Sequence, residues 1–178
     1  LMDDRYFFLC KKKKTVSEEE SPSYGPIVKL KWIGYKGDPL YIYKLRTMYP
    51  FSEFIQGDLF LKNYLDLSGK IKNDYRITSW GKVFRKYFID EIPQIYNWLK
   101  GDLNLVGVRA ISNQYFNLYP KNVQDSRIKF KPGLIPPYYA DLPKTFEDII
   151  KSEEIYLNQK EKAPFYTDLK YFCKAIIN

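Results

Sequence analysis

"YFIDEIPQIYNWLKGDLNLVGVRA", residues 87–110, joins an acidic pair to the clearest helical pattern in the chain. A helix is predicted by apolar residues that recur at helical spacing: Ile92, Ile95, Tyr96 and Leu99. Gly101 is typical of a helix end. Asp90 stands at the natural N-cap position, and Pro93 falls in the first turn, where proline is tolerated. "LNLVG" (103–107) then predicts a short strand.

The segments on either side predict the rest of the fold. "IVKLKWIGY" (27–35) and "LYIYKLRTM" (40–48) are strand-like runs that favour a hairpin, joined by the turn "KGDP". Helices are expected at about 79–89, in 111–119 and 123–130, and at about 146–158 and 165–177. The predicted class is α/β (α+β): a small antiparallel hairpin and short strands surrounded by amphipathic helices, in a single domain.

The start of the chain has a different composition. "DDRYFFLC" (3–10) reads as a short strand, and residues 11–23 read as a charged linker that includes the run "KKKK". We therefore expect residues 1–24 to be the end of a possible preceding domain plus a linker, and residues 25–178 to be the functional domain. Residues 50–74 read as a long polar loop. No apolar run approaches the roughly 18 residues of a membrane span, although a segment upstream of Leu1 stays open.

Composition narrows the chemistry. The chain has no histidine, which excludes mechanisms that need a histidine base or ligand, and its two cysteines exclude a Cys-rich zinc site. The formal net charge of +8 favours an anionic partner: phosphates, nucleic acid or an acidic membrane surface. Simple solvation of a Lys-rich surface is the plainer alternative. Nucleic acid is disfavoured, because the aromatic residues follow core spacing instead of alternating with Lys and Arg on one strand face.

Two interpretations fit the acidic pair, Asp90 and Glu91. In the structural interpretation, Asp90 caps a helix and Glu91 is a favourable charge in its first turn. Each would contribute about 0.5–1 kcal/mol to stability. As functional groups, an ionised carboxylate at a helix start can attack phosphorus while its neighbour holds a divalent cation. That chemistry needs several cations around the pair. The candidates are Lys44, Arg46, Arg76, Arg85 and Arg109.

An ordered set of segments resembles the bacterial sugar transferases, the polyprenyl-phosphate phosphoglycosyl transferases of the monotopic type. The long block at 73–110, "NDYRITSWGKVFRKYFIDEIPQIYNWLKGDLNLVGVRA", is nearly complete against that family's pattern. "YIYKLRTM" (41–48), "RIKFKPGL" (127–134) and "APFYTDLKYFCKAI" (163–176) are similar to its other elements. No single short segment identifies the family, but the ordered set of segments does.

The resemblance implies a role for each matched residue. Asp90 matches the nucleophile that attacks the β-phosphate of a nucleoside-diphosphate sugar, a UDP-sugar, and expels UMP. Glu91 matches the residue that coordinates the cofactor Mg²⁺. Arg85 and Arg109 match arginines expected near the phosphates, and Lys44, Arg46 and Arg76 match further motif cations. A polyprenyl phosphate then accepts the sugar phosphate, in cell-surface glycan or exopolysaccharide synthesis.

The sequence also departs from the family's pattern. A charged linker stands where a membrane helix usually precedes the domain, "GVRA" (107–110) replaces G-P-R-P, and "IPPYYADLPKTFED" (135–148) replaces a T-G-x-x-Q segment. Tyr138 and Tyr139 offer a candidate apolar groove for a prenyl chain, with simple packing as the alternative. We expect a peripheral position at the cytoplasmic face of the inner membrane, or a cytoplasmic one if the membrane helix is absent. The alternative function is a catalytically divergent domain that binds nucleotide sugars as a regulatory or interaction module.

Overall fold

The computed structural model describes residues 24–52, 54–57, 59, 66–67 and 71–178. The predicted strand at 3–10, the linker and its lysine run lie outside the described residues. So does part of the predicted loop at 50–74.

The predicted hairpin is confirmed. Strands β1 (Ile27–Ile33) and β2 (Pro39–Leu45) pair antiparallel, with Ile27 opposite Leu45 and Ile33 opposite Pro39. A 3-10 turn, η2 (Tyr35–Gly37), joins them. The inner face of β2 contributes Leu40 and Ile42 to a buried cluster that also holds Leu103 and Ala110.

The segment around the acidic pair folds as three short helical pieces. They are α2 (Ser79–Lys86), the 3-10 turn η3 (Ile89–Glu91) and α3 (Gln94–Leu99). Phe88 has a left-handed backbone conformation (φ 56°), so the chain changes direction between α2 and η3. The prediction that Asp90 is an N-cap is therefore wrong, because the residue lies inside η3 and Pro93 occupies the N-cap position of α3.

The second half of the chain is mainly helical. Strands β3 (Asn104–Val106) and β4 (Gly133–Ile135) form a parallel pair, and the helices α4 (Asn113–Phe116) and α5 (Lys121–Arg127) lie between them in sequence. Gly133 is required at this crossing, because a Cβ there would collide with the backbone of Gly107 and Val106. β4 and the short helix α6 (Tyr138–Asp141) were not predicted.

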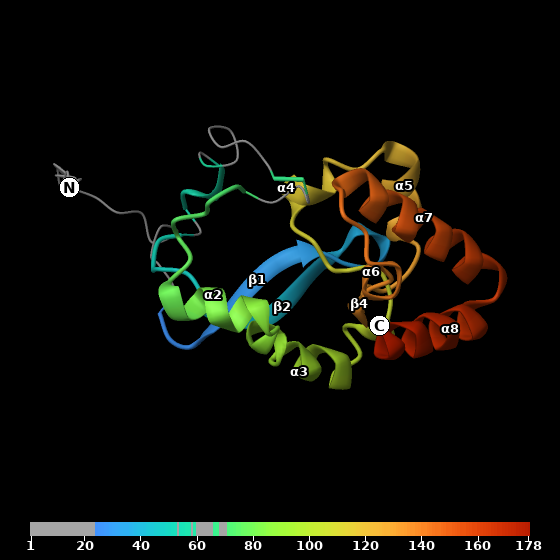
Figure 1. Ribbon diagram of the computed structural model, residues 1–178, viewed down its shortest axis with the longest axis horizontal. Helices are drawn as coiled ribbons and strands as arrows, with labels where there is room; N and C mark the ends of the chain where they lie inside the picture. Colours follow the sequence, from blue (N-terminus) through green and yellow to red (C-terminus); the bar gives the residue numbers. More distant parts are fainter. Residues whose placement is uncertain (1–23, 53, 58, 60–65, 68–70) are drawn as a thin grey trace, which may run out of the picture.

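Two longer helices, α7 (Phe146–Lys162) and α8 (Pro164–Ile177), confirm the prediction for the end of the chain. They pack against each other, and α8 also contacts β3 and α6 (Figure 1). The largest buried cluster lies among these elements. Its members are Val106, Val108, Ala140, Tyr156, Leu157 and Tyr171. The mixed fold class is confirmed: a hairpin and a short parallel strand pair, surrounded by helices.

α3 is inverted relative to the usual amphipathic helix. It buries two amide side chains, Gln94 and Asn97. The apolar residues that predicted it are exposed: Ile95, Tyr96 and Leu99 on the helix, and Ile92 just before it. The buried face packs against β2, where Asn97 bonds to the backbone of Tyr41 and Tyr43. The helix was predicted correctly, but its apolar side faces outward.

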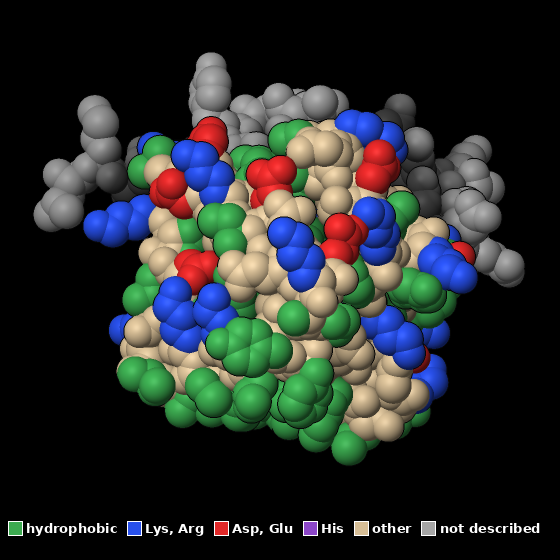
Figure 2. Space-filling view, turned by 90° about the vertical axis from the view of Figure 1, so that its right-hand side faces the viewer, with side chains coloured by type: hydrophobic (Ala, Val, Ile, Leu, Met, Phe, Trp, Pro, Cys, Tyr) green, Lys and Arg blue, Asp and Glu red, His purple; other side chains and the backbone are tan. Residues whose placement is uncertain are grey.

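Further exposed apolar side chains lie on α8: Phe165, Leu169, Ile176 and Ile177. Hydrophobic side chains gather along the lower edge of the molecule in Figure 2, the edge along which α3 and α8 lie in Figure 1. We call these exposed apolar residues the apolar edge: Ile92, Ile95, Tyr96 and Leu99 in and just before α3, and Phe165, Leu169, Ile176 and Ile177 on α8. Among the helices of the described residues, none is both long and apolar enough to span a membrane.

Candidate active site

The acidic pair lies where the path of α2 turns into α3. Asp90 is 6% exposed and Glu91 is half-buried, so both carboxylates are largely removed from bulk water. The isolated carboxylates would be costly to bury, and cations from other elements offset that cost. η3 packs against both α2 and β2, which fixes the pair relative to the hairpin.

Glu91 is held by two cations that are remote in sequence. Lys44 Nζ, from β2, donates to Glu91 Oε1 at 2.7 Å, and Arg109 Nη2 donates to the same oxygen. Burial alone would raise the pKa of Glu91, but the charges of Arg109 and Lys44 outweigh it and hold the pKa below its usual value. Burial and the charge of Arg109 lower the pKa of Lys44 to about 8, against the opposing effect of Glu91.

Asp90 has different surroundings. Its Oδ2 lies 4.0 Å from Lys44 Nζ, and within the described part of the chain its carboxylate accepts no hydrogen bond. Arg85, from α2, supplies a second charge that acts on Asp90. An ionised carboxylate near cations but without a hydrogen-bond donor keeps its lone pairs available for bonding to an electrophile.

Arg109 is oriented by residues from the second half of the chain. Its Nη1 donates to the Tyr138 hydroxyl at 2.5 Å, and its backbone carbonyl accepts from Arg127, which pairs with the buried Glu153. The sequence suggests for Tyr138 only a place in an apolar groove. Its contact with Arg109 was not predicted, because the two residues meet only through the packing of α6 and carry no joint motif.

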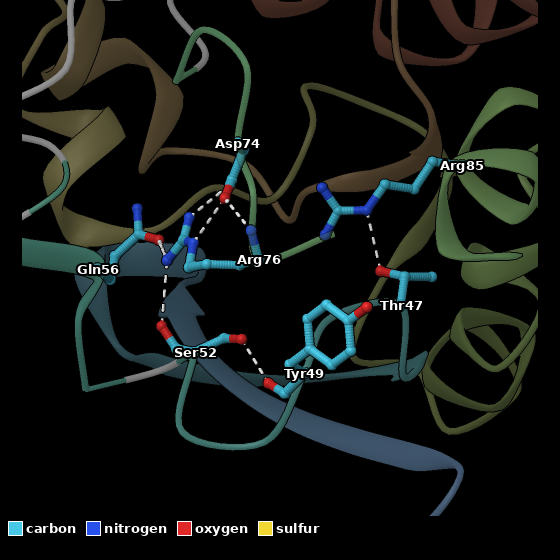
Figure 3. A network of polar contacts seen from close by, with 7 residues as sticks. All are labelled: Thr47, Tyr49, Ser52, Gln56, Asp74, Arg76 and Arg85. Atoms are coloured by element: carbon cyan, nitrogen blue, oxygen red, sulfur yellow. Dashed lines mark hydrogen bonds and ion pairs between the residues drawn. The ribbon is translucent and has the colours of Figure 1, made fainter. Parts of the chain in front are cut away.

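Arg85 and Arg76 lie close together but differ in what they bind (Figure 3). The Arg76 side chain is 3% exposed and is enclosed by Asp74, Gln56 and the carbonyl of Ser52. Arg85 uses Nε to donate to Thr47 Oγ1 at 2.9 Å, and among the described residues its two Nη atoms have no hydrogen-bond acceptor. Arg85 therefore has donors to spare, whereas Arg76 organises the loop beside it.

The structure brings together most of the predicted site residues. Lys44, Asp90, Glu91 and Arg109 form one cluster, with Arg85 next to it. Arg46 lies beside the open end of the hairpin, where its Nε donates to the carbonyl of Gly25 at 2.7 Å. Arg76 lies in the neighbouring loop, where its side chain pairs with Asp74.

The acidic pair is also a candidate metal site. Within the described ranges, no group of three or more Asp, Glu, Cys or His side chains gathers around a common point. Lys44 and Arg109 both contact Oε1 of Glu91, and neither contacts Oε2. A protein site of one or two carboxylates fits Mg²⁺ when substrate phosphates and water supply its other oxygens.

Comparison with known proteins identifies the family of this chain. Residues 17–178 match the family model described as "Bacterial sugar transferase". The chain is 37% identical over 131 residues to "Galactosyl transferase CpsE" of Streptococcus agalactiae, and 38% identical over 145 residues to "Uncharacterized sugar transferase EpsL" of Bacillus subtilis. It is 36% identical over 107 residues to "Undecaprenyl-phosphate galactose phosphotransferase" of Salmonella typhimurium.

These matches differ in coverage. They include 71%, 80% and 57% of this chain, but only 29%, 64% and 22% of the respective relatives. The family model, in contrast, extends over nearly the whole chain and contains every residue of the cluster described above. The chain belongs to the bacterial sugar transferase family.

Proposed function

We propose that this chain is a phosphoglycosyl transferase that moves a sugar 1-phosphate from a UDP-sugar to a polyprenyl phosphate, with Asp90 as nucleophile. The observation that best supports this proposal is that the two neighbouring carboxylates differ in their hydrogen bonds. Glu91 is bonded by Lys44 and Arg109, whereas the neighbouring Asp90 carboxylate accepts no hydrogen bond from the described residues. The names of relatives that transfer sugar phosphates to undecaprenyl phosphate support the substrate pair.

In the first half-reaction, an oxygen of Asp90 forms a bond to the β-phosphorus of the UDP-sugar. The bond from that phosphorus to the bridging oxygen breaks, and UMP leaves with the electron pair. In the second, an oxygen of the polyprenyl phosphate attacks the same phosphorus and the bond to Asp90 breaks. The carboxylate is restored, and the product is a polyprenyl diphosphate sugar.

The surrounding cations suit this chemistry. Guanidinium groups bind phosphate oxygens in a fixed fork geometry, and Arg85 has unused donors beside Asp90. The charges of Arg109 and Lys44 favour the ionised form of Glu91, and its Oε2, which neither of them contacts, suits a magnesium ion. Bound Mg²⁺ would offset the negative charge of the diphosphate, which otherwise repels an anionic nucleophile.

The test replaces the nucleophile and follows the products. Asp90→Asn keeps the volume of the side chain but removes the nucleophilic oxygen, so turnover should fall on the order of a thousandfold or more while the fold persists. The assay incubates UDP-galactose or UDP-glucose with polyprenyl phosphate and Mg²⁺ and separates UMP from UDP by chromatography. Circular dichroism of the variant checks folding.

Two results would contradict the proposal. An Asp90→Asn variant with near-normal turnover would show that Asp90 is not the nucleophile. Release of UDP by the unsubstituted chain would indicate transfer at the sugar carbon, which is a different reaction. Removal of Mg²⁺ by a chelator should stop UMP release from the unsubstituted chain.

We also infer that the apolar edge places this domain on a lipid surface. A polyprenyl acceptor resides in a membrane, and the apolar edge exposes side chains such as Leu99, which is 72% exposed. Exposed lysines accompany these residues, among them Lys100 at the end of α3 and Lys170 on α8. An apolar surface with flanking cations is typical of peripheral binding to anionic lipid.

A further inference from the structure

Gln94 is buried at the start of α3 without a hydrogen bond for its amide nitrogen. The residue is 6% exposed, and Nε2 is the one buried side-chain nitrogen or oxygen in the described part of the chain that lacks a partner. Buried donors in folded proteins are almost always paired, so an orphaned donor calls for an explanation. A donor that is reserved for a ligand is one such explanation.

The next amide on the same helix shows the usual situation. Asn97 is also buried, and its side chain makes three hydrogen bonds. Its Oδ1 accepts from the Tyr43 backbone N–H at 3.1 Å, while Nδ2 donates to the Tyr41 carbonyl at 2.7 Å and to Asp102 at 3.3 Å. The two amides lie one turn apart on the same side of α3, but only Asn97 is used by the fold.

The position of Gln94 points to the acidic pair. It follows Glu91 by three residues, and its amide is close enough to help lower the pKa of that carboxyl. That effect on the pKa is of hydrogen-bond type, but by distance and angle the Nε2 atom itself makes no hydrogen bond to Glu91 or to any other described group. The unused donor therefore lies beside the carboxylates where the proposed reaction takes place.

We propose that Gln94 is a substrate-binding residue whose Nε2 donates a hydrogen bond to a phosphate oxygen of the nucleotide sugar bound at Asp90 and Glu91. This inference rests on the proposed function and adds a neutral donor to its cationic site. Lys44 and Arg109 already repel each other: after burial, the charge of Arg109 is the next cause of the lowered pKa of Lys44. A neutral amide can bond another phosphate oxygen without adding a third positive charge to that cluster. It forms and breaks no covalent bond.

The test compares two variants on one helix. Gln94→Met keeps the length of the side chain but removes the donor. Because the donor has no partner in the fold, the thermal midpoint should stay unchanged or rise, while kcat/KM for UDP-galactose or UDP-glucose falls about tenfold to a hundredfold. Asn97→Leu should behave oppositely. It should lower the midpoint by about 5 °C and leave the turnover of the folded fraction close to that of the unsubstituted chain.

Two outcomes would overturn the assignment. If Gln94→Met retains kcat/KM within twofold, the amide does not bind the substrate. If its thermal midpoint falls together with its activity, the amide is part of the fold.

A binding measurement separates this inference from the proposed function. On an Asp90→Asn background, which should not turn over, calorimetry with UDP-galactose or UDP-glucose and Mg²⁺ gives the dissociation constant directly. Adding Gln94→Met should raise this constant about tenfold. An unchanged constant counts against Gln94 alone, whereas turnover by Asp90→Asn or release of UDP counts against the proposed reaction.

Discussion

Asp90 and Glu91 are adjacent in sequence and share Lys44 as a neighbour, but they differ in their hydrogen bonds and in their second cation. Glu91 is bonded to Lys44 and Arg109, so its carboxylate is fixed in orientation and ionised. Asp90 feels the charges of Lys44 and Arg85 without a hydrogen bond to either. A turn of 3-10 helix makes this possible, because it directs two consecutive side chains toward different neighbours.

Asp74 provides a residue-scale prediction on pH. It accepts from Arg76 through both oxygens, at 2.8 Å and 2.6 Å. Burial acts to raise the pKa of Asp74, but the hydrogen bonds and charge of Arg76 outweigh it and lower the pKa. A lowered carboxyl pKa stabilises the fold above the unfolded-state value of about 3.9, and this contribution is lost as the pH falls through the folded-state pKa.

Asp74→Asn should therefore lower the free energy of unfolding at pH 7 by about 3 kcal/mol, because the buried Arg76 loses its counter-charge. The difference in the free energy of unfolding between the variant and the unsubstituted chain should shrink below pH 4. Urea unfolding at pH 7 and at pH 3 measures it. Asp125→Asn is the matched control, because Asp125 forms an exposed pair with Lys121 and should change stability little. A deficit that is equal at pH 7 and pH 3 would exclude charge as its source.

At the scale of elements, the start of α2 packs closely against the residues that follow β2, and a glycine of α2, Gly81, permits this close contact. The N-cap of α2 is Thr78, whose hydroxyl accepts from the Gly81 N–H, and whose backbone N–H donates to the Thr47 carbonyl at 3.0 Å. A Cβ on Gly81 would collide with that same carbonyl. This close approach also brings Arg85 within reach of Thr47 Oγ1.

Gly81→Ala is expected to destabilise the protein by about 2 kcal/mol, because the added methyl group overpacks a backbone contact. The sign is informative, since alanine in place of glycine normally stabilises a helix by about 1 kcal/mol. Thermal unfolding measures the effect, and Lys82→Ala, at the next, exposed position of α2, should be nearly neutral. A stabilised Gly81→Ala variant would mean that α2 does not sit this close to Thr47.

At the scale of the whole molecule, the inversion of α3 and the exposed residues of α8 form the apolar edge (Figure 2). Single exposed apolar residues are common on soluble proteins, but contiguous apolar surfaces mark interaction sites. The occupant that we infer is a lipid surface. It also agrees with the predicted attraction of a chain of net charge +8 to anionic lipid.

Ile92→Glu together with Leu99→Glu should weaken binding to vesicles with a quarter anionic lipid by at least about tenfold, because each side chain contributes roughly 1.5 kcal/mol or more on burial. Co-sedimentation across a salt series separates the two contributions. Electrostatic binding weakens as salt rises, whereas the apolar part persists. The double variant should therefore lose mainly the salt-resistant part.

Ile155→Glu serves as the control, because Ile155 is an exposed apolar residue of α7, which lies above α8 in Figure 1. Equal losses in the control and the double variant would argue against a specific edge. Binding of the double variant at the level of the unsubstituted chain would show that something other than lipid covers this surface, such as another segment of the chain.

The sequence by itself determined the local elements of this protein and singled out four charged residues that the fold brings together. The hairpin, the helices α2, α3, α7 and α8, and the cluster of Lys44, Asp90, Glu91 and Arg109 follow from patterns within short segments or from the family's motif order. These features were predictable because strand alternation, helical spacing and motif residues are read over a few neighbouring positions.

Only the tertiary structure decided how those elements face one another. α3 turns its amides inward because Asn97 finds backbone partners on β2, and helical spacing alone does not say which side meets the core. Arg76 is enclosed because Asp74, Gln56 and Ser52 converge on it, and Arg109 gains Tyr138 because α6 packs beside it. Such contacts join residues that are distant in the chain, so the physical reason for them is packing and not local preference.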